Sequence, residues 1–317
     1  MPCQHKSTQH KSARQTASDY PFFKNIGIKP CRERFTLCNV QKIMPKRKPS
    51  HKSGHRRRDA TRSGGASPAR EQNPSHKMWL YGAHAVEAAM ANPARRKYRL
   101  LTTDDDKIQL DEDGKAISET MARRDMDEIL PPGAVHQGIA LEVAPLAGMD
   151  IGDITEEAAD DALVILLDQA SDPRNIGAVM RSAAAFGASA IILPDRHAPE
   201  VTGVLAKAAS GALEKLPLVR VTNVARTLAQ LKDADFWCIG LDGDADAALS
   251  SAARAGRVAL IIGSEGRGLR RLTAEKCDAL ASIPMLPSAG SLNLSAAAAI
   301  ALYELRRTDN HLPHFNN

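Results

Sequence analysis

Apolar residues in the second half of the chain fall into short runs separated by helical patterns. Continuous runs at Leu163–Leu167, Ala190–Leu193 and Val258–Ile262 predict strands buried on both faces. Because strands alternate with helices, the pattern predicts an α/β domain over residues 162–310, with a parallel sheet covered on both faces. The remaining expected elements are strands at Leu218–Val221, Phe236–Leu241 and Ala281–Pro284, and helices at Asn175–Phe186, Ala206–Leu213, Val224–Leu231 and from Ala296 onward.

A smaller α/β unit is predicted ahead of this domain, over residues 78–145. Polar, acidic residues 146–161 are expected to link the two. The elements expected in the smaller unit are a turn and short helix at Tyr81–Met90, a strand at Lys97–Thr103, a helix at Glu119–Ile129 and a closing strand at Ile139–Val143.

Residues 1–77 show no hydrophobic periodicity and are rich in Lys, Arg, Ser, His, Gly and Pro, which predicts a disordered basic extension. They hold 18 basic and 4 acidic residues (net +14), which leaves 24 basic and 33 acidic residues (net −9) in the rest of the chain. A basic arm on an acidic body favours a polyanionic partner. A merely solvated extension, or a start at Met44 or Met78, remains an alternative.

The length of 317 residues allows about two domains. No run of about eighteen apolar residues occurs, so no membrane span is expected. The charged N-terminus lacks the apolar stretch of a secretory signal. Five cysteines without a CxxC pair argue against a zinc site or a disulfide framework. We therefore expect a cytoplasmic protein with no metal.

Three segments of the larger domain combine small and polar residues in a way that favours ligand binding. In the first, Asp172-Pro173 suits a helix entry, with Asp as the cap and Pro as the first helical residue. Asn175 then lies in the first turn, where it can face a strand-end crevice, and Arg181 follows six residues later. The alternatives are a capping role for Asn175 and a surface ion pair for Arg181.

The second segment is the loop Gly263-Ser-Glu-Gly-Arg-Gly-Leu269, which opens directly from a predicted buried strand. Its backbone resembles a phosphate cradle, but Glu265 better suits a cationic or hydrogen-bonding group. It matches neither GxGxxG nor a Walker loop. A strand-end turn with a solvated glutamate is the alternative.

The third segment runs from Ile283 through a Ser/Gly/Pro-rich loop into Ser291-Leu-Asn293-Leu-Ser295 and the alanine-faced helix. Ser291 and Asn293 alternate with Leu292, so their side chains are expected to point together. A helix cap at Asn293–Ser295 is an alternative that is compatible with ligand binding.

Other chemical candidates are weak. His84 and His136 are isolated and are interpreted as structural histidines. Asp242–Asp246 lacks the last glutamate of a calcium loop. No Ser/His/Asp or Cys/His arrangement stands out, and no glycine fingerprint of a dinucleotide-binding oxidoreductase follows a strand.

Together and in this order, the three segments resemble the SpoU/TrmH family of RNA ribose 2′-O-methyltransferases, within the SPOUT superfamily. The resemblance covers about residues 162–307 and rests on Asp-Pro-x-Asn-x-Gly-x-x-x-Arg, Ile-Gly-x-Glu-Gly-x-Gly and Ile-Pro-Met followed by Ser-Leu-Asn. Tyr81-Gly-x-His-Ala-Val86 and His136-Gln-Gly138 resemble the small L30e-like substrate-binding domain of members that act on 23S rRNA. One departure, Leu294 where relatives often carry Val, is a swap between apolar residues.

The resemblance implies a C-terminal trefoil knot, S-adenosyl-L-methionine as cofactor, and a homodimer. It implies methylation of an RNA ribose, with a guanosine of 23S rRNA as the favoured target. A tRNA ribose methyltransferase and a catalytically silent RNA-binding or ribosome-assembly protein are the rivals. The residues implied to hold the cofactor are Gly263, Ile283, Met285 and Leu292, and those implied to act on substrate are Asn175, Arg181, Glu265, Ser291 and Asn293.

The role of Arg181 has two versions. The resemblance makes it the group that accepts the proton of the 2′-hydroxyl. A guanidinium has a pKa above about 12 and is a poor base. Our hypothesis is that Arg181 grips the adjacent phosphate and so lowers the pKa of the hydroxyl.

Overall fold

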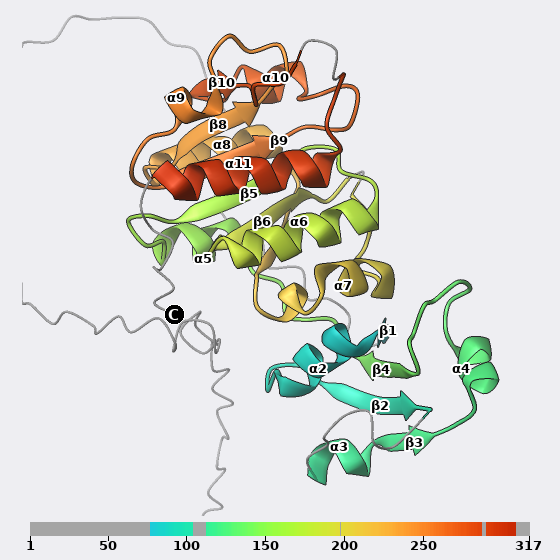
Figure 1. Cartoon of the computed structure of the whole chain (residues 1–317). Helices are drawn as coiled ribbons and strands as arrows, with labels where there is room; N and C mark the ends of the chain where they lie inside the picture. Colours follow the sequence, from blue (N-terminus) through green and yellow to red (C-terminus); the bar gives the residue numbers. More distant parts are fainter. Residues whose placement is uncertain (1–76, 104–111, 197, 287–289, 309–317) are drawn as a thin grey trace, which may run out of the picture.

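The computed structural model describes residues 77–103, 112–196, 198–286 and 290–308, which form two β-sheets with their helices (Figure 1). Residues 1–76 of the predicted basic extension and residues 104–111 lie outside the described residues. The expected α/β fold with a parallel sheet is confirmed in the larger domain.

The first sheet has the strand order β1-β4-β2-β3. Strands β1 and β2 each pair antiparallel with β4, whereas β3 pairs parallel with β2. The elements of this unit are β1 (Met78–Tyr81), α2 (Ala83–Ala91), β2 (Lys97–Thr102), α3 (Glu112–Ala116), β3 (Ser118–Thr120), α4 (Arg123–Ile129) and β4 (Ile139–Val143).

The second sheet has the order β10-β8-β9-β5-β6-β7, and all of its strands are parallel. Its strands are β5 (Leu163–Leu167), β6 (Ala190–Pro194), β7 (Leu218–Val221), β8 (Trp237–Leu241), β9 (Val258–Ile262) and β10 (Ala279–Ala281). The helices of this part are α5 (Ile151–Glu156), α6 (Pro173–Ala185), α7 (Gly203–Ala209), the 3-10 turn η3 (Ala212–Glu214), α8 (Val224–Asp233), α9 (Leu249–Ala252), α10 (Arg271–Ala274) and α11 (Leu294–Thr308).

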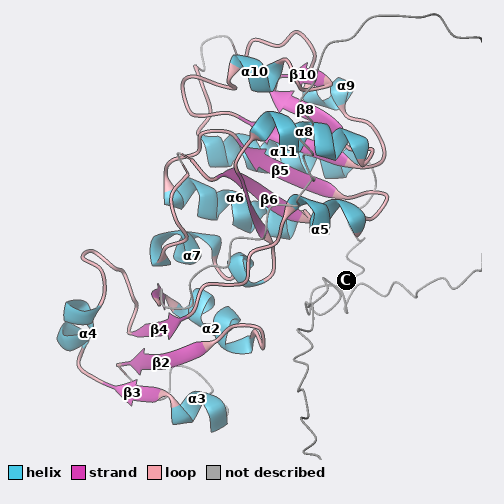
Figure 2. Cartoon of the chain, turned by 180° about the vertical axis from the view of Figure 1, so that it is seen from behind, coloured by secondary structure: helices cyan, strands magenta, loops and turns pink. Residues whose placement is uncertain are grey.

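The core follows from the two-residue period of the strands. In the central strand β5, Leu163, Ile165 and Leu167 share an apolar cluster with α6 and α11, while Val164 and Leu166 join a second cluster with α8. Helices α6 and α11 therefore cover one face of the sheet and α5 and α8 the other (Figures 1 and 2). This double covering explains why the strand sequences are continuous apolar runs.

Helix α6 packs against α7 at a point where only glycine fits. A Cβ on Gly177 would lie 2.4 Å from the carbonyl oxygen of Leu205 and 2.6 Å from the Cβ of Ala208. Gly177, two residues after Asn175, thus lets α6 and α7 approach closely. Because Asn175 lies in the first turn of α6, this packing also fixes the direction from which its side chain enters the site.

Three predicted elements differ from the observed ones. The helix expected at Glu119–Ile129 is wrong at its start, because Ser118–Thr120 pair with β2 as a strand and the helix begins at Arg123. The helix expected at Ala206–Leu213 breaks at Ser210, which has a positive φ of 50°, and continues as η3. The last strand ends at Ala281, so Ile283 lies in the following loop.

Residues 146–161, expected to be a linker, contain helix α5. A reciprocal capping box joins Asp150 to Asp153 at its start, and Ile154 packs into the cluster beneath α8. The segment that leads from the first sheet to the second is therefore packed onto the larger domain.

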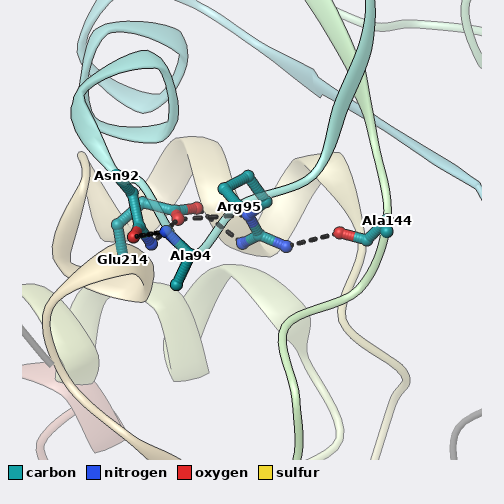
Figure 3. A network of polar contacts seen from close by, with 5 residues as sticks. All are labelled: Asn92, Ala94, Arg95, Ala144 and Glu214. Carbon is teal, nitrogen blue, oxygen red and sulfur yellow. Dashed lines mark hydrogen bonds and ion pairs between the residues drawn. The ribbon is translucent and has the colours of Figure 1, made fainter. Parts of the chain in front are cut away.

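A buried ion pair joins the two units (Figure 3). Arg95, just before β2, donates from Nε to Glu214 Oε2 at 3.1 Å, from Nη2 to Glu214 Oε1 at 2.5 Å, and from Nη1 to the carbonyl of Ala144 at 2.8 Å. Asn92 donates a further hydrogen bond to Glu214 at 2.8 Å. The side chains of Arg95 and Glu214 are 1% and 4% exposed. Both charges are thus removed from water and satisfied only in this docked arrangement.

Replacing Glu214 by alanine is expected to lower the free energy of unfolding by about 3–5 kcal/mol, because Arg95 is left buried without its counter-charge. Urea denaturation measures the change. The matched control is Glu119→Ala, which breaks an exposed pair with Arg99 and should barely move the midpoint. Equal, small effects of both substitutions would contradict the inference that the buried pair secures the docked unit.

Candidate active site

The three segments singled out in the sequence meet at one edge of the larger sheet. The first follows the carboxyl end of β5, the second that of β9 and the third that of β10. Since the strands are parallel, these ends lie at the same edge. The carboxyl edge of an open parallel sheet is the usual ligand site of α/β proteins.

Glu265 joins the three segments through a single oxygen. Its Oε1 accepts hydrogen bonds from Asn175 Nδ2 at 2.8 Å, from Asn293 Nδ2 at 2.9 Å and from the backbone N–H of Leu294 at 3.1 Å. Asn293 Nδ2 also lies 3.3 Å from Asn175 Oδ1. Side chains that are 90 and 28 residues from Glu265 along the chain therefore form one polar cluster. Glu265 is exposed, as the solvated-glutamate alternative expected, but its carboxylate also bonds to both neighbouring segments, so solvent is not its only partner.

Both asparagines come from the first residues of helices, for local reasons. Asp172 caps α6 by accepting from the N–H of Arg174 at 2.8 Å, and Pro173 occupies the first position, as predicted. Asn175 is thus not the cap. Asn293 caps α11 by accepting from the N–H and the hydroxyl of Ser295 at 2.9 and 2.6 Å. Asn293 can cap the helix and contact Glu265 at the same time, because the cap uses its Oδ1 and the bond to Glu265 uses its Nδ2.

The loop that carries Glu265 is a closed hairpin. Ser264 and Gly268 exchange two backbone hydrogen bonds, each of 3.0 Å. At the base, a Cβ on Gly263 would lie 2.1 Å from the carbonyl carbon of Gly268, so only glycine allows the two strands of the hairpin to touch. The hairpin presents Glu265 to the two helix N-termini, whose partial positive charge favours a carboxylate.

A buried carboxylate anchors this hairpin to the first segment. Asp168, the residue after β5, is 1% exposed. It accepts from Thr273 Oγ1 at 2.8 Å and from Arg270 Nε at 3.0 Å, and Arg270 Nη2 forms an ion pair with its other oxygen. Arg270 and Thr273 directly follow the hairpin. Arg270 and Thr273 are 102 and 105 residues from Asp168 along the chain. Their bonds therefore tie the end of the hairpin to the start of the segment that carries Asn175.

Sequence reasoning gave no role to Asp168, Arg270 or Thr273. One signal was present: an acidic residue closes the apolar run of β5, where burial is expected to continue. A carboxylate in that position needs partners, but their identity depends on a fold contact over a hundred residues away.

The other predicted site residues do not join the Glu265 cluster. Arg181 is exposed on α6 and makes no ion pair or hydrogen bond with any residue that the structure describes, so the surface ion pair is not seen there. Ser291 is exposed and Leu292 is partly buried. Ile283 is partly buried against the core, whereas Met285 is 40% exposed. All of these lie on α6 or on the loop between β10 and α11.

Cysteine and histidine chemistry is not supported at this site. Burial raises the pKa of Cys238 to about 12 and that of Cys277 to about 11, so neither thiol is a ready nucleophile. His136 is buried, with Nε2 3.1 Å from Asp127 and Nδ1 accepting from the N–H of Gly138, which is the structural role expected of it. In the described ranges, no group of three or more His, Cys, Asp or Glu is arranged to hold a metal ion. No described helix is long and apolar enough to cross a membrane.

The first unit reaches the same side of the domain at α7. Lys207 of α7 donates to the carbonyl of Val135, and burial lowers the pKa of this lysine. Burial raises the pKa of Tyr81 at the end of β1, and the charge of Arg174 partly offsets the rise. Arg174 precedes Asn175 on α6, so the end of β1 lies within electrostatic reach of the site's first segment.

A hollow of about 550 Å³ lies elsewhere, near the starts of β8 and β9. Its charged groups are largely paired: Lys232 with Asp278 at 2.7 Å, and Arg257 with backbone carbonyls. Arg254 stacks on Trp237 with 3.6 Å to the ring centroid. Its position at the amino-terminal edge of the sheet separates it from the three segments, and we do not assign it to the active site.

The fold and the site define a parallel α/β domain whose ligand edge is built from three loops held by one carboxylate. The model of the SpoU rRNA Methylase family matches residues 162–303. The chain is 39% identical over 237 residues to the 23S rRNA (guanosine-2′-O-)-methyltransferase RlmB of Escherichia coli (strain K12), which covers 72% of this chain and 97% of that protein. The chain therefore belongs to the SpoU rRNA methylase family.

Similarities to two further proteins agree with this assignment. An uncharacterized tRNA/rRNA methyltransferase of Mycolicibacterium vanbaalenii is 37% identical over 301 residues, which covers 84% of this chain and 95% of that protein. The crystal structure of the SpoU methyltransferase AviRb from Streptomyces viridochromogenes has a TM-score of 0.61 and 26% identity, and covers 73% of this chain and 89% of that one. The AviRb complex with AdoMet has the same fold, with a TM-score of 0.62 and 24% identity over 74% of this chain and 91% of that one.

Substituting Asp168 by alanine is expected to lower the free energy of unfolding by about 1–3 kcal/mol, since buried Thr273 loses its acceptor. It should also speed hydrogen exchange at the amides of Ser264 and Gly268, because the exit of the hairpin is released. Chemical denaturation and exchange monitored by mass spectrometry measure the two effects. Asp246→Ala, in an exposed loop, is the control. Unchanged exchange in the Asp168 variant would show that the hairpin does not depend on this anchor.

Proposed function

We propose that this protein transfers a methyl group from S-adenosyl-L-methionine to a ribose 2′-hydroxyl of RNA, and that the target is a guanosine of 23S rRNA. The observation that carries the proposal is the convergence of Asn175, Glu265 and Asn293 on one hydrogen-bonded cluster. Those residues lie in the three motifs that define the family resemblance. The target follows from the 39% identity to the Escherichia coli enzyme, whose name states that substrate.

The residues at the sheet edge fit a cofactor with both polar and apolar parts. Ser264 Oγ is buried and has no hydrogen-bond partner among the described residues, which marks a polar group available to a ligand. Ile283, Leu292 and Met285 supply apolar surface from the loop that enters α11. We propose that the backbone groups of Gly263, Ile283 and Leu292 bind the cofactor and that Met285 lies next to the bound cofactor. S-adenosyl-L-methionine supplies an electrophilic methyl group on a sulfonium.

Substrate activation falls to Arg181 in this proposal. A ribose hydroxyl is a poor nucleophile, so it needs help with its proton and close alignment with the methyl group. Arg181 is exposed and free of partners in the described part of the chain, so its guanidinium is available to an RNA phosphate. We assign to it the grip on the phosphate beside the reacting ribose, which lowers the pKa of the hydroxyl. Asn175, Glu265, Ser291 and Asn293 orient substrate and cofactor.

The first unit is assigned to RNA binding, as an L30e-like domain over residues 78–145. The Arg95–Glu214 pair supports the assignment, because it holds this unit at a fixed place relative to the larger domain. Residues 1–77 add non-specific affinity for RNA through their net charge of +14. The place of action is the cytoplasm, where ribosomal RNA is found.

A homodimer and a knotted C-terminus complete the proposal. Ile300 and Tyr303 of α11 are 43% and 48% exposed, and the Tyr303 ring lies edge-on to Phe186, 6.2 Å between centroids. This apolar surface across α11 and the end of α6 supports a dimer that covers it. The knot is supported by the return of α11 to pack beside α6 after β10 has joined the far edge of the sheet.

A methyl-transfer assay with labelled cofactor and ribosome-free 23S rRNA tests the function. The wild-type protein is expected to label one ribose 2′-oxygen of 23S rRNA, and Arg181→Ala to lower turnover by about 100-fold or more. Arg226→Ala changes an exposed arginine on α8, on the other face of the sheet, and should keep wild-type turnover.

Three results would contradict parts of this account. Labelling of tRNA but not of 23S rRNA would replace the substrate. RNA binding without any transfer would favour a silent binding protein. Wild-type turnover in Arg181→Ala would exclude both versions of the role of this arginine.

A further inference from the structure

One buried hydroxyl in the active-site hairpin stands apart from the other polar side chains. The Oγ atom of Ser264 is shielded from solvent and has no hydrogen-bond partner, and it is the single buried side-chain oxygen or nitrogen of this kind within the described ranges. Burying a hydroxyl without a partner is unfavourable, and native proteins rarely leave one so. Its presence at a ligand edge therefore calls for a partner outside the polypeptide.

The Ser264 hydroxyl has no partner among the described residues, although the main chain around it is held by several hydrogen bonds. The backbone N–H and carbonyl of Ser264 are both bonded to Gly268 at 3.0 Å, so the residue is fixed within the hairpin. The next residue, Glu265, is held by three donors, and the hairpin's exit is tied to Asp168 through Arg270. The main chain on both sides of Ser264 is therefore fixed, which keeps its hydroxyl at one place in the hairpin. The hydroxyl is thus preorganised for a ligand.

The position of Ser264 indicates which ligand. It is the second residue after β9, between Gly263, whose backbone is assigned to the cofactor, and Glu265, which joins the substrate-orienting asparagines. A hydroxyl both donates and accepts, so it suits the neutral polar groups of a nucleoside as well as charged ones. Glu265 and Asn293 are exposed and so accessible to RNA, whereas Ser264 Oγ is buried.

We propose that the Ser264 hydroxyl forms a direct hydrogen bond to S-adenosyl-L-methionine. The cofactor would then supply the hydrogen-bond partner that this hydroxyl lacks among the described residues. This inference rests on the proposed function. It assigns to one side chain a share of the cofactor's affinity that the motif resemblance gives only to backbone groups. It also has an unusual consequence, since the same hydroxyl is unfavourable for the protein alone and favourable for the complex.

The test is the variant Ser264→Ala, measured in the full-length protein in two ways. Without cofactor, its unfolding midpoint should rise, because a buried hydroxyl with no partner is removed. With cofactor, calorimetry should show a Kd for S-adenosyl-L-methionine, and for S-adenosylhomocysteine, weakened by about 3- to 10-fold, the value of one neutral hydrogen bond. Ser251→Ala, an exposed serine on α9, is the control and should change neither quantity.

The outcomes separate the inference from the proposed function. A serine with a merely structural role would give an unfolding midpoint that falls and a Kd that stays the same, which would overturn the inference alone. An unchanged Kd with a raised midpoint would overturn it as well. If the wild-type protein bound neither S-adenosyl-L-methionine nor S-adenosylhomocysteine, the proposed function would fail and the inference with it.

Discussion

The arrangement of the proposed active site depends on the hydrogen bonds that one carboxylate oxygen, Glu265 Oε1, accepts. Glu265 Oε1 accepts hydrogen bonds from two other segments: from Asn175, which follows β5, and from Asn293 and the backbone N–H of Leu294, which open the last helix. Charge-assisted bonds of this kind are stronger and more directional than bonds between neutral groups. Without the carboxylate, the starts of α6 and α11 would keep only the 3.3 Å contact between Asn293 and Asn175, and the amide of Asn175 would lose its 2.8 Å bond.

Several other features of the domain position Glu265 Oε1. The doubly covered parallel sheet aligns the strand ends, glycine at positions 177 and 263 allows close backbone approach, and Asp168 holds the exit of the hairpin. The Arg95–Glu214 pair sets the position of the smaller unit beside this edge. A buried ion pair is weak support for stability by itself, because desolvation opposes the attraction. Its stronger effect is geometric: the two units dock in the one arrangement that satisfies both charges.

Much of this order was predictable from local pattern. Apolar runs marked β5, β6 and β9, Asp172-Pro173 marked the start of α6, and the three motifs named the members of the Glu265 cluster. The features that the sequence did not predict depend on contacts between residues that are far apart in the chain. Ser118–Thr120 form a strand only because β2 offers an edge, and a charged sequence next to a helix gives no sign of that pairing. The partners of Asp168 likewise lie over a hundred residues away. The domain boundaries, the knot and the catalytic and cofactor-binding roles of all the site residues remain predictions.

The central claim is that Glu265 assembles the catalytic arrangement rather than supporting the fold. The most direct measurement is single-turnover methyl transfer to 23S rRNA by Glu265→Ala, with thermal unfolding recorded on the same preparation. The account predicts a folded protein whose transfer rate falls by about 100-fold or more, as displaced reacting groups require. A variant that unfolds at the wild-type temperature and transfers methyl groups at the wild-type rate would contradict it.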